Sequence, residues 1–184
     1  MTPRHFLFLQ SSARPEGNSL GLARLAASFL PESAGLIWRD LNDPALPPFH
    51  DRRHGSGIAY GPPEAGAAEL AAQTLEATDI VFVAPLYWYG LPAPAKLYLD
   101  HWSHWLRLPD LNFKARMAGK TLWLVMAHAG STPEEIAPAI GTLHGSANYM
   151  SLKWGGVLLA DANAPGGWRK DQSALAAARH FFAA

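Results

Sequence analysis

Residues 11 to 19 are small, hydroxylated or turn-forming, with one arginine among them: Ser-Ser-Ala-Arg-Pro-Glu-Gly-Asn-Ser. A short apolar run from His5 to Leu9 precedes this segment and is typical of a buried strand. Apolar residues at helical spacing follow from Leu20 to Leu30, until Pro31 ends the pattern. A strand-to-helix turn of this kind directs free main-chain N–H groups and the positive end of a helix dipole at one point, which suits a phosphate.

The side chains of this turn fit the same chemistry. Arg14 adds a positive charge, and Gly17 permits a backbone angle that other residues resist. Four side chains add hydrogen-bond donors, namely Ser11, Ser12, Asn18 and Ser19. The alternative is an ordinary capped helix, because Asn and Ser are among the commonest N-caps. This loop alone supports both interpretations equally.

Three consecutive aromatic residues, Tyr87, Trp88 and Tyr89, follow a second apolar run. Neighbouring side chains at a strand end point in opposite directions, so the three cannot all face one core. Several prolines stiffen this segment, and Gly90 lets the backbone approach a flat object closely. A hydrophobic plug under a loop is the alternative, but a platform for a planar aromatic ligand explains the rigid residues better. This platform would be formed by Pro85, Leu86, Tyr87, Trp88, Tyr89 and Gly90.

A third segment, His128, Ala129, Gly130 and Ser131, leads directly into the start of a helix. Thr132 with Glu135 three residues later is a capping-box signature. The small residues expose main-chain amides that can bond to carbonyls or ring nitrogens of the same ligand. A plain N-capped turn is equally consistent with this segment. Together the three segments indicate a site for a phosphorylated planar cofactor.

The elements that must position these segments alternate along the chain. Strands are expected at 5–9, 35–41, 79–84, 121–127 and 157–160, and helices at 20–30, 64–77, 94–106, 133–143 and 169–182. This alternation predicts an α/β fold in which a parallel sheet has helices on both faces. No domain-scale linker interrupts it, so residues 1–184 are expected to form one domain.

The phosphate-type turn after the first strand favours a particular topology. We expect a flavodoxin-like three-layer sandwich with five parallel strands in the order 2-1-3-4-5. Ligands of such sheets bind at the carboxyl ends of the strands, beside the switch point. The site should therefore be built from the loops after strands one, three and four, and FMN is the phosphorylated planar cofactor that this fold most readily binds.

Composition excludes several other classes of protein. The 184 residues have a formal net charge of zero, so no basic surface for nucleic acid is indicated. No apolar run is long enough for a membrane span, and the N-terminus lacks the pattern of a secretory signal. Cysteine is absent, which excludes disulfides, thiolate metal sites and a catalytic thiol. A cytoplasmic protein is the resulting expectation.

Two motifs resemble those of a known group of enzymes. S-S-x-R-x-x-G-N-S from residue 11 and P-L-Y-W-Y-G-L-P-A-P-A-K-L-Y-L-D from residue 85 are similar to motifs of the flavodoxin-like NAD(P)H-dependent FMN reductase and quinone reductase superfamily. The resemblance implies that FMN is bound with its phosphate at Ser11, Arg14, Gly17, Asn18 and Ser19. It places the ring and ribityl chain against residues 85–89, and a third contact region on residues 128–131. It also implies a homodimer or homotetramer whose interface borders the flavin.

The expected activity is an oxidoreductase that transfers a hydride from NAD(P)H to bound FMN. Electrons would then pass to a quinone, free flavin or similar small acceptor. The cofactor performs this chemistry, so no catalytic acid–base residue is expected. A flavodoxin-type electron carrier is the alternative, although such carriers are strongly acidic and this chain is neutral. A second alternative is a phosphosugar- or nucleotide-binding protein without flavin. The aromatic loop argues against this alternative.

Two further features carry expectations of their own. The Pro- and Gly-rich connection 42–63 is long enough to cover the ring and select the substrate. On the helix expected at 94–106, Asp100, His101 and His104 lack a third metal ligand, so exposed or interface histidines are expected rather than a metal site. Trp102 and Trp105 on the same helix indicate a partner surface.

Overall fold

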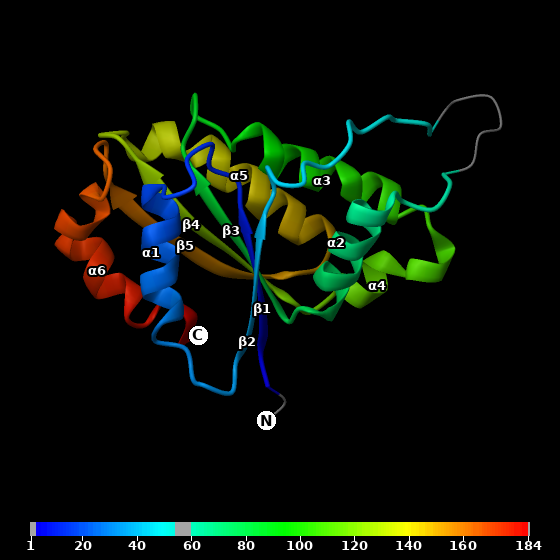
Figure 1. The fold of residues 1–184 in the computed structure, drawn as a ribbon, viewed down its shortest axis with the longest axis horizontal. Coiled ribbons are helices and arrows are strands. Elements are labelled where there is room, and N and C mark those ends of the chain that lie inside the picture. The colour runs from blue at the N-terminus through cyan, green and yellow to red at the C-terminus, as the bar shows by residue number, and fades with distance from the viewer. Residues whose placement is uncertain (1–2, 54–59, 184) are drawn as a thin grey trace.

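The computed structural model describes residues 3–53 and 60–183, and its centre is one parallel sheet (Figure 1). The strands are β1 (His5–Gln10), β2 (Gly35–Asp40), β3 (Asp79–Pro85), β4 (Thr121–His128) and β5 (Lys153–Asp161). Their order is β2-β1-β3-β4-β5, and every neighbouring pair is parallel. The predicted fold class and strand order are confirmed.

Helices cover both faces of the sheet (Figure 1). On one face lie α1 (Asn18–Ala27) and α6 (Gln172–Ala178); on the other lie α2 (Ala65–Glu76), α3 (Ala93–Trp105), α4 (Phe113–Met117) and α5 (Pro133–Tyr149). Three short 3₁₀ turns complete the described elements: η1 (Pro109–Leu111), η2 (Gly167–Lys170) and η3 (Phe181–Ala183).

The two faces of the sheet carry separate apolar cores, because side chains alternate along each strand. On β1, Phe6 and Phe8 pack with α1 and α6, whereas Leu7 and Leu9 pack with the helices of the other face. The central strand β3 is buried on both faces, which explains its continuous apolar sequence. Because β1, β3 and β4 are parallel neighbours, their carboxyl ends lie side by side at one edge of the sheet.

Several predicted boundaries were wrong. Helix α1 ends at Ala27 rather than at residue 30, so Phe29 lies beyond it and is 46% exposed. The capping box on Thr132 is confirmed, but α5 continues to Tyr149 because its buried stripe extends through Leu143 to Ala147. The predicted last helix is instead divided into η2, α6 and η3, and α4 was not predicted.

Strand β5 begins four residues earlier than predicted, and two glycines had concealed it. A Cβ on Gly155 would lie 2.3 Å from the ring of Trp123, so only glycine fits beside that indole. Gly156 has a φ of +122°, which favours glycine, and the β4–β5 register shifts at this point. The absence of side chains at a β-bulge weakened the sequence pattern of a strand.

The predicted indole surface on α3 was wrong, because Trp102 is 4% and Trp105 0% exposed. His101 is also buried, contrary to expectation, and its Nε2 lies 2.8 Å from the carbonyl oxygen of Pro47. His104 Nε2 lies 2.8 Å from the carbonyl oxygen of Gly61. The two histidines thus fasten both ends of the 42–63 connection to α3.

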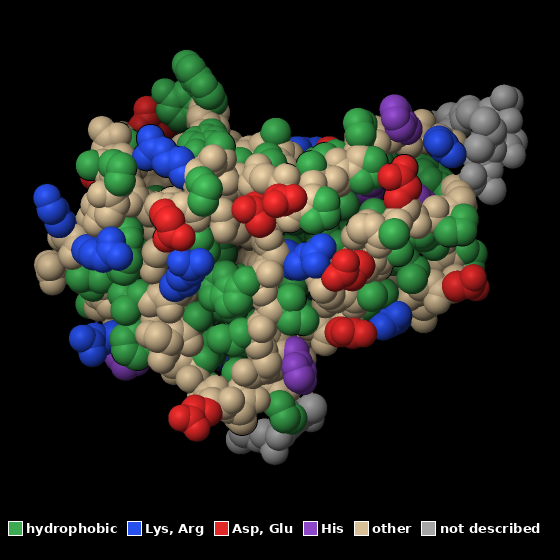
Figure 2. Space-filling model, in the orientation of Figure 1, with side chains coloured by type: hydrophobic (Ala, Val, Ile, Leu, Met, Phe, Trp, Pro, Cys, Tyr) green, Lys and Arg blue, Asp and Glu red, His purple; other side chains and the backbone are tan. Residues whose placement is uncertain are grey.

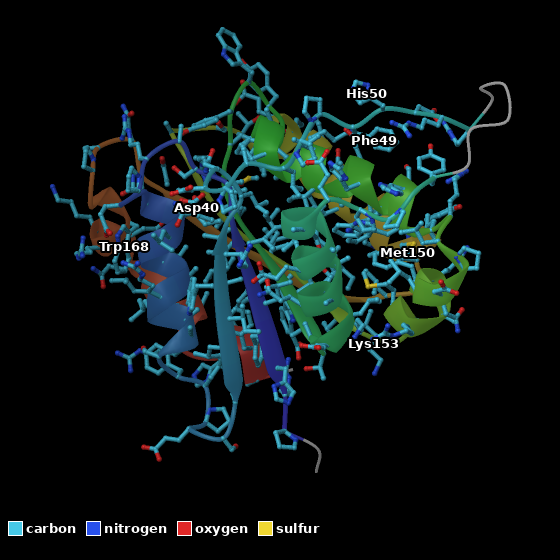
Figure 3. All side chains as sticks on the ribbon, turned by 45° about the vertical axis from the view of Figure 1, so that its right-hand side comes forward. Asp40, Phe49, His50, Met150, Lys153 and Trp168 are labelled. Carbon is cyan, nitrogen blue, oxygen red and sulfur yellow. The ribbon has the colours of Figure 1, made fainter. Side chains whose placement is uncertain are left out.

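Figure 3 shows this connection, with Phe49 and His50, running along α3. Residues 54–59 of it lie outside the described residues. Among the described residues, no cluster of three or more His, Asp or Glu side chains suits a metal ion. No helix in the described ranges has the length and apolarity needed to cross a membrane.

Candidate functional site

The amino end of α1 points its first-turn N–H groups at the carboxyl edge of the sheet. Its N-cap is Gly17, which has no side chain to cap them, and the Gly21 N–H bond to the Gly17 carbonyl oxygen (3.1 Å) is the first intrahelical one. Trp168 fixes the helix by packing so closely on Gly21 that a Cβ there would lie 2.3 Å from the indole nitrogen. Figure 3 shows Trp168 beside α1. The uncapped helix end can accept an anion.

Gly17 is required for a different reason from the one predicted. Its φ of −72° is open to any residue, so the expectation of a special backbone angle was wrong. A Cβ at this position would lie 2.8 Å from Ser12 Oγ and 3.4 Å from the Arg14 carbonyl oxygen. The loop folds back so closely on the helix start that a side chain at Gly17 would displace Ser12.

The serine hydroxyls of this loop hold its shape. Ser12 Oγ accepts the Arg14 N–H (3.1 Å), and Ser19 Oγ accepts the Ala127 N–H at the end of β4 (3.0 Å). Ser11 is 1% exposed, and its Oγ lies 3.4 Å from the Val83 carbonyl oxygen. Ser12 and Ser19 act as acceptors in these bonds and retain a hydroxyl proton to donate, whereas Ser11 points into the sheet.

Asn18 joins the site to a loop that the sequence did not single out. Its Nδ2 donates to the carbonyl oxygens of Ala162 (2.8 Å) and Ala164 (3.0 Å), after β5. Its Oδ1 is buried and has no hydrogen-bond partner among the described residues. A ligand hydroxyl or amide could therefore bond to this oxygen. The position of Ala162 directly after a strand, next to β4 in the sheet, was the signal that could have revealed this fourth loop.

A cavity of about 170 Å³ lies between these loops. Its lining comprises Ser12, Arg14, Gly17, Asn18, Ser19, Pro85, Leu86, Tyr87, Ala127, His128, Ala129, Ala162 and Asn163. The three predicted loops thus converge on one space. The other predicted site residues, Ser11, Trp88, Tyr89, Gly90, Gly130 and Ser131, lie outside its lining, as do the described residues of the 42–63 connection.

No Asp or Glu among the described residues lines the cavity, and Arg14 stands exposed beside it. Within the described ranges Arg14 makes no salt bridge. Together with the amino end of α1, this charge favours an anionic ligand group over a cationic one.

The aromatic loop forms a tight turn at the rim of the cavity. The main chains of Tyr87 and Gly90 exchange two hydrogen bonds (3.1 and 3.0 Å), and Trp88 and Tyr89 at the tip have φ of +47° and +62°. Trp88 is 95% and Tyr89 51% exposed. Figure 2 shows hydrophobic side chains projecting at the top, where Figure 1 shows the loop after β3. Bulky residues rarely adopt these angles, so the turn is locally strained.

Two main-chain amides of the loop after β4 are already bonded within the protein. The Gly130 N–H donates to Asp161 Oδ1 (2.8 Å), and the Ser131 N–H donates to His128 Nδ1 (3.2 Å). Asp161 is in turn held by Asp171, whose Oδ2 accepts the Asp161 N–H (2.9 Å). Bonds from the main-chain amides of Ala174 and Asp161 lower the pKa of Asp171.

The family model described as the flavodoxin-like fold matches residues 4–182. The chain belongs to this family. Over 135 residues it is 30% identical to a Bacillus subtilis (strain 168) protein named "Putative NAD(P)H-dependent FMN-containing oxidoreductase YwqN", covering 72% of this chain and 74% of that one.

Solved structures share the family fold. The Trp repressor binding protein from Bacillus subtilis has a TM-score of 0.75 at 23% identity, covering 96% of this chain and 97% of that one. An FMN-dependent NADH-azoreductase from Bacillus anthracis str. Ames Ancestor, solved with FMN, has a TM-score of 0.66 at 13% identity, covering 96% and 97%. At these identities the likeness shows the flavodoxin-like fold.

Proposed function

We propose that this flavodoxin-like protein binds FMN at the carboxyl edge of its sheet and is an NAD(P)H-dependent FMN oxidoreductase, with residues 1–184 acting as one domain. The observation that carries the proposal is the cavity in which the uncapped end of α1 meets the exposed aromatic turn after β3. The named relative, an NAD(P)H-dependent FMN-containing oxidoreductase by its title, supports the same chemistry.

The residues present fit FMN in two parts. The cavity of about 170 Å³ is smaller than the roughly 300–1,000 Å³ of a typical ligand pocket, so it suits the phosphate and the polar chain rather than the rings. The first-turn N–H groups of α1, with Ser12, Arg14 and Ser19, would bind the phosphate. Asn18 Oδ1, buried without a partner, would accept a ribityl hydroxyl.

The isoalloxazine rings would then lie outside the cavity, against the turn formed by Tyr87, Trp88 and Tyr89. Exposed aromatic surface of this kind binds a planar π system by stacking and by apolar burial. FMN supplies the hydride chemistry when bound, and the chain's own residues bind and orient it. One face of the rings would remain open to NAD(P)H and then to the acceptor.

For the acceptor we propose a quinone, a free flavin or a similar small molecule that can stack on the open face. A flavodoxin-type electron carrier is disfavoured by the zero formal net charge, because carriers rely on a strongly charged surface to dock their partners. We also propose a homodimer or homotetramer whose interface borders this site. The 95% exposure of Trp88 at a strained turn supports such an interface.

The visible absorption spectrum of the purified protein tests the proposal. Flavin bands that bleach within seconds of anaerobic NADPH or NADH addition are expected, and the faster donor is the preferred one. Flavin that stays oxidised under both donors would indicate the carrier instead. A protein without flavin bands after incubation with FMN would refute the proposed function.

A further inference from the structure

Strand β2 is an edge strand with an exposed apolar surface. It lies at one end of the order β2-β1-β3-β4-β5, and no described strand pairs with its outer side. Its central residues, Leu36, Ile37 and Trp38, are 41%, 38% and 37% exposed. Figure 1 shows β2 at the front of the molecule between α1 and α2, and Figure 2 shows hydrophobic side chains in the middle of the same face.

The features that usually protect such an edge are absent from β2. Natural edge strands carry lysine or proline, or bend away at a β-bulge. β2 contains neither residue, and it pairs with β1 along its whole length without a register shift. Its one basic residue, Arg39, is bonded to Glu69 on α2 (2.8 Å). An exposed apolar edge of this kind is suited to pairing with another strand.

The main-chain groups that β2 leaves open can be identified. The N–H groups of Gly35 and Leu41 bond toward β1, so alternate residues between them face β1 and Leu36, Trp38 and Asp40 face outward. The Asp40 carbonyl oxygen already accepts a main-chain N–H of its own loop (3.4 Å). Leu36 and Trp38 therefore each present an N–H and a C=O group to a partner strand.

A second copy of β2 satisfies these groups in one antiparallel register. When Leu36 pairs with Trp38 of the second copy, each exchanges both of its main-chain hydrogen bonds with the other, and a two-fold axis passes between the two Ile37 residues. The cross-strand neighbours are then apolar on both faces of the sheet. Arg39 lies opposite Gly35, which has no side chain to oppose it.

The neighbouring registers are less favourable. A shift of two residues in one direction places Ile37 opposite Arg39 and directs the bonds of Leu36 to the occupied carbonyl oxygen of Asp40. The same shift in the other direction places Trp38 opposite Ala34, whose N–H already donates to its own loop (2.9 Å). Apolar contact, charge and open main-chain groups thus favour the same register.

We propose that β2 is an interface between two copies of this chain, which pair through antiparallel β2 strands with Ile37 at the two-fold axis. The two sheets continue as one across this interface. Leu36 and Trp38 lie on the α1 face, where Trp38 stacks on Phe8 (3.9 Å between ring centroids), and Ile37 lies on the α2 face. The pairing does not depend on FMN and is separate from the interface proposed beside the cavity.

The chain has no cysteine, so a single introduced thiol reports the register directly. In the proposed pairing the two Ile37 Cα atoms face each other at about 4.5 Å, within disulfide range. We expect Ile37→Cys to form a disulfide-linked dimer under mild oxidation with diamide. Leu36→Cys should link far less, because its two copies are offset along the strands. Ala176→Cys, exposed on α6, is the control for random collision.

Two patterns of cross-linking would overturn the proposal. Linking of Leu36→Cys in preference to Ile37→Cys would show a different register. Linking of Ile37→Cys no greater than that of Ala176→Cys would show that the strands do not pair. A non-reducing gel distinguishes these results, and reduction should reverse the link.

The mass in solution gives a second test. Light scattering of the wild type should give a mass above the 19.9 kDa of one chain. Ile37→Lys places two like charges at the axis and should halve the wild-type mass, whereas Ala176→Lys should retain it. A wild-type mass of one chain, or an Ile37→Lys variant with the wild-type mass, would refute the interface. Circular dichroism establishes that each variant folds; if Ile37→Lys does not, the cysteine variants still decide.

Discussion

At the scale of single residues, the shape of the candidate site depends on the absence of a side chain at Gly17 as well as on the polar side chains around it. Gly17 has ordinary backbone angles, yet it is the residue whose side chain would collide with the loop that surrounds the helix end. Asn18 and His128 both line the cavity and also hold loops in place, Asn18 the loop after β5 and His128 its own loop. Because each residue has two roles, substitutions that remove one role and keep the other can separate them.

Replacing Gly17 by alanine should damage the phosphate cradle and leave the fold intact. The new Cβ would lie 2.8 Å from Ser12 Oγ, so the Ser12 side chain must rotate or the loop must move, and either change disturbs the bond from the Arg14 N–H. We expect FMN affinity to fall about tenfold or more, which corresponds to roughly 1.4 kcal/mol. Gly66→Ala, at an exposed position of α2, is the control, because a Cβ there meets nothing within 4 Å. Equal affinities for the two variants would show that the loop accommodates the methyl group.

Asp171 links pH to the stability of the β4–β5 edge. Its carboxylate accepts the Ala174 N–H as the N-cap of α6 and the Asp161 N–H, and these bonds lower its pKa. Because the folded pKa is lowered, the stabilisation is present above the ordinary value of 3.8 and is lost as pH falls below it.

We therefore expect Asp171→Ala to lower the free energy of unfolding by about 1 kcal/mol at pH 7. The difference from wild type should shrink at pH values below 3.8, where the carboxylate becomes protonated. Urea unfolding of both proteins at pH 7 and at a pH below 3.8 measures this difference. A difference of the same size at both would contradict a role for the charged carboxylate.

At the scale of elements, the turn after β3 combines a strained main chain with an exposed aromatic surface. Type I′ turns favour Asn-Gly at their two central positions, where this chain has Trp88 and Tyr89 with positive φ. The strain is local, because the flanking main chains of Tyr87 and Gly90 are fully paired. An element that carries strain and exposes a tryptophan is best explained by what it binds.

The double variant Trp88→Asn with Tyr89→Gly should therefore be more stable than wild type and bind flavin more weakly. Relief of two left-handed conformations, offset by the extra freedom of glycine in the unfolded chain, predicts a gain of about 1 kcal/mol. Urea unfolding of the apoprotein and the FMN titration measure the two effects. A variant that loses stability would show that these rings make contacts that stabilise the apoprotein.

At the scale of the whole molecule, the site lies where strands from distant parts of the chain end side by side. Ligand binding at this edge should stabilise the entire fold, because FMN would bind the native state and not the unfolded chain. The amino end of α1 predicts that the phosphate carries much of this effect.

FMN should accordingly stabilise the protein far more than riboflavin, which has the same rings and no phosphate. With FMN at 100 times its dissociation constant the expected gain is about 2.7 kcal/mol. Riboflavin at the same concentration should give a clearly smaller increase in melting temperature, and Gly17→Ala should reduce the difference between the two. Equal stabilisation by both ligands would show that the FMN phosphate does not bind at the amino end of α1.

The local sequence determined the order of the elements and much of the site. Continuous apolar runs identified β1, β3 and β4, because strands covered on both faces are apolar at every position. The small-residue turn after β1 and the aromatic run after β3 identified two walls of the cavity. From the strand order it followed that these loops meet at one edge.

Only the tertiary structure decided which polar groups remain available. Ser19 bonds to Ala127 across 108 residues, and Asn18 bonds to Ala162 across 144. Such partners leave no trace in a local pattern, so amides that looked free are bonded and a fourth loop joins the site. The burial of Trp102 and Trp105 depends in the same way on residues that the tertiary fold places against α3. Periodicity reports which face of an element is apolar, whereas hydrogen-bond partners and burial depend on elements that are distant in the chain and adjacent in space.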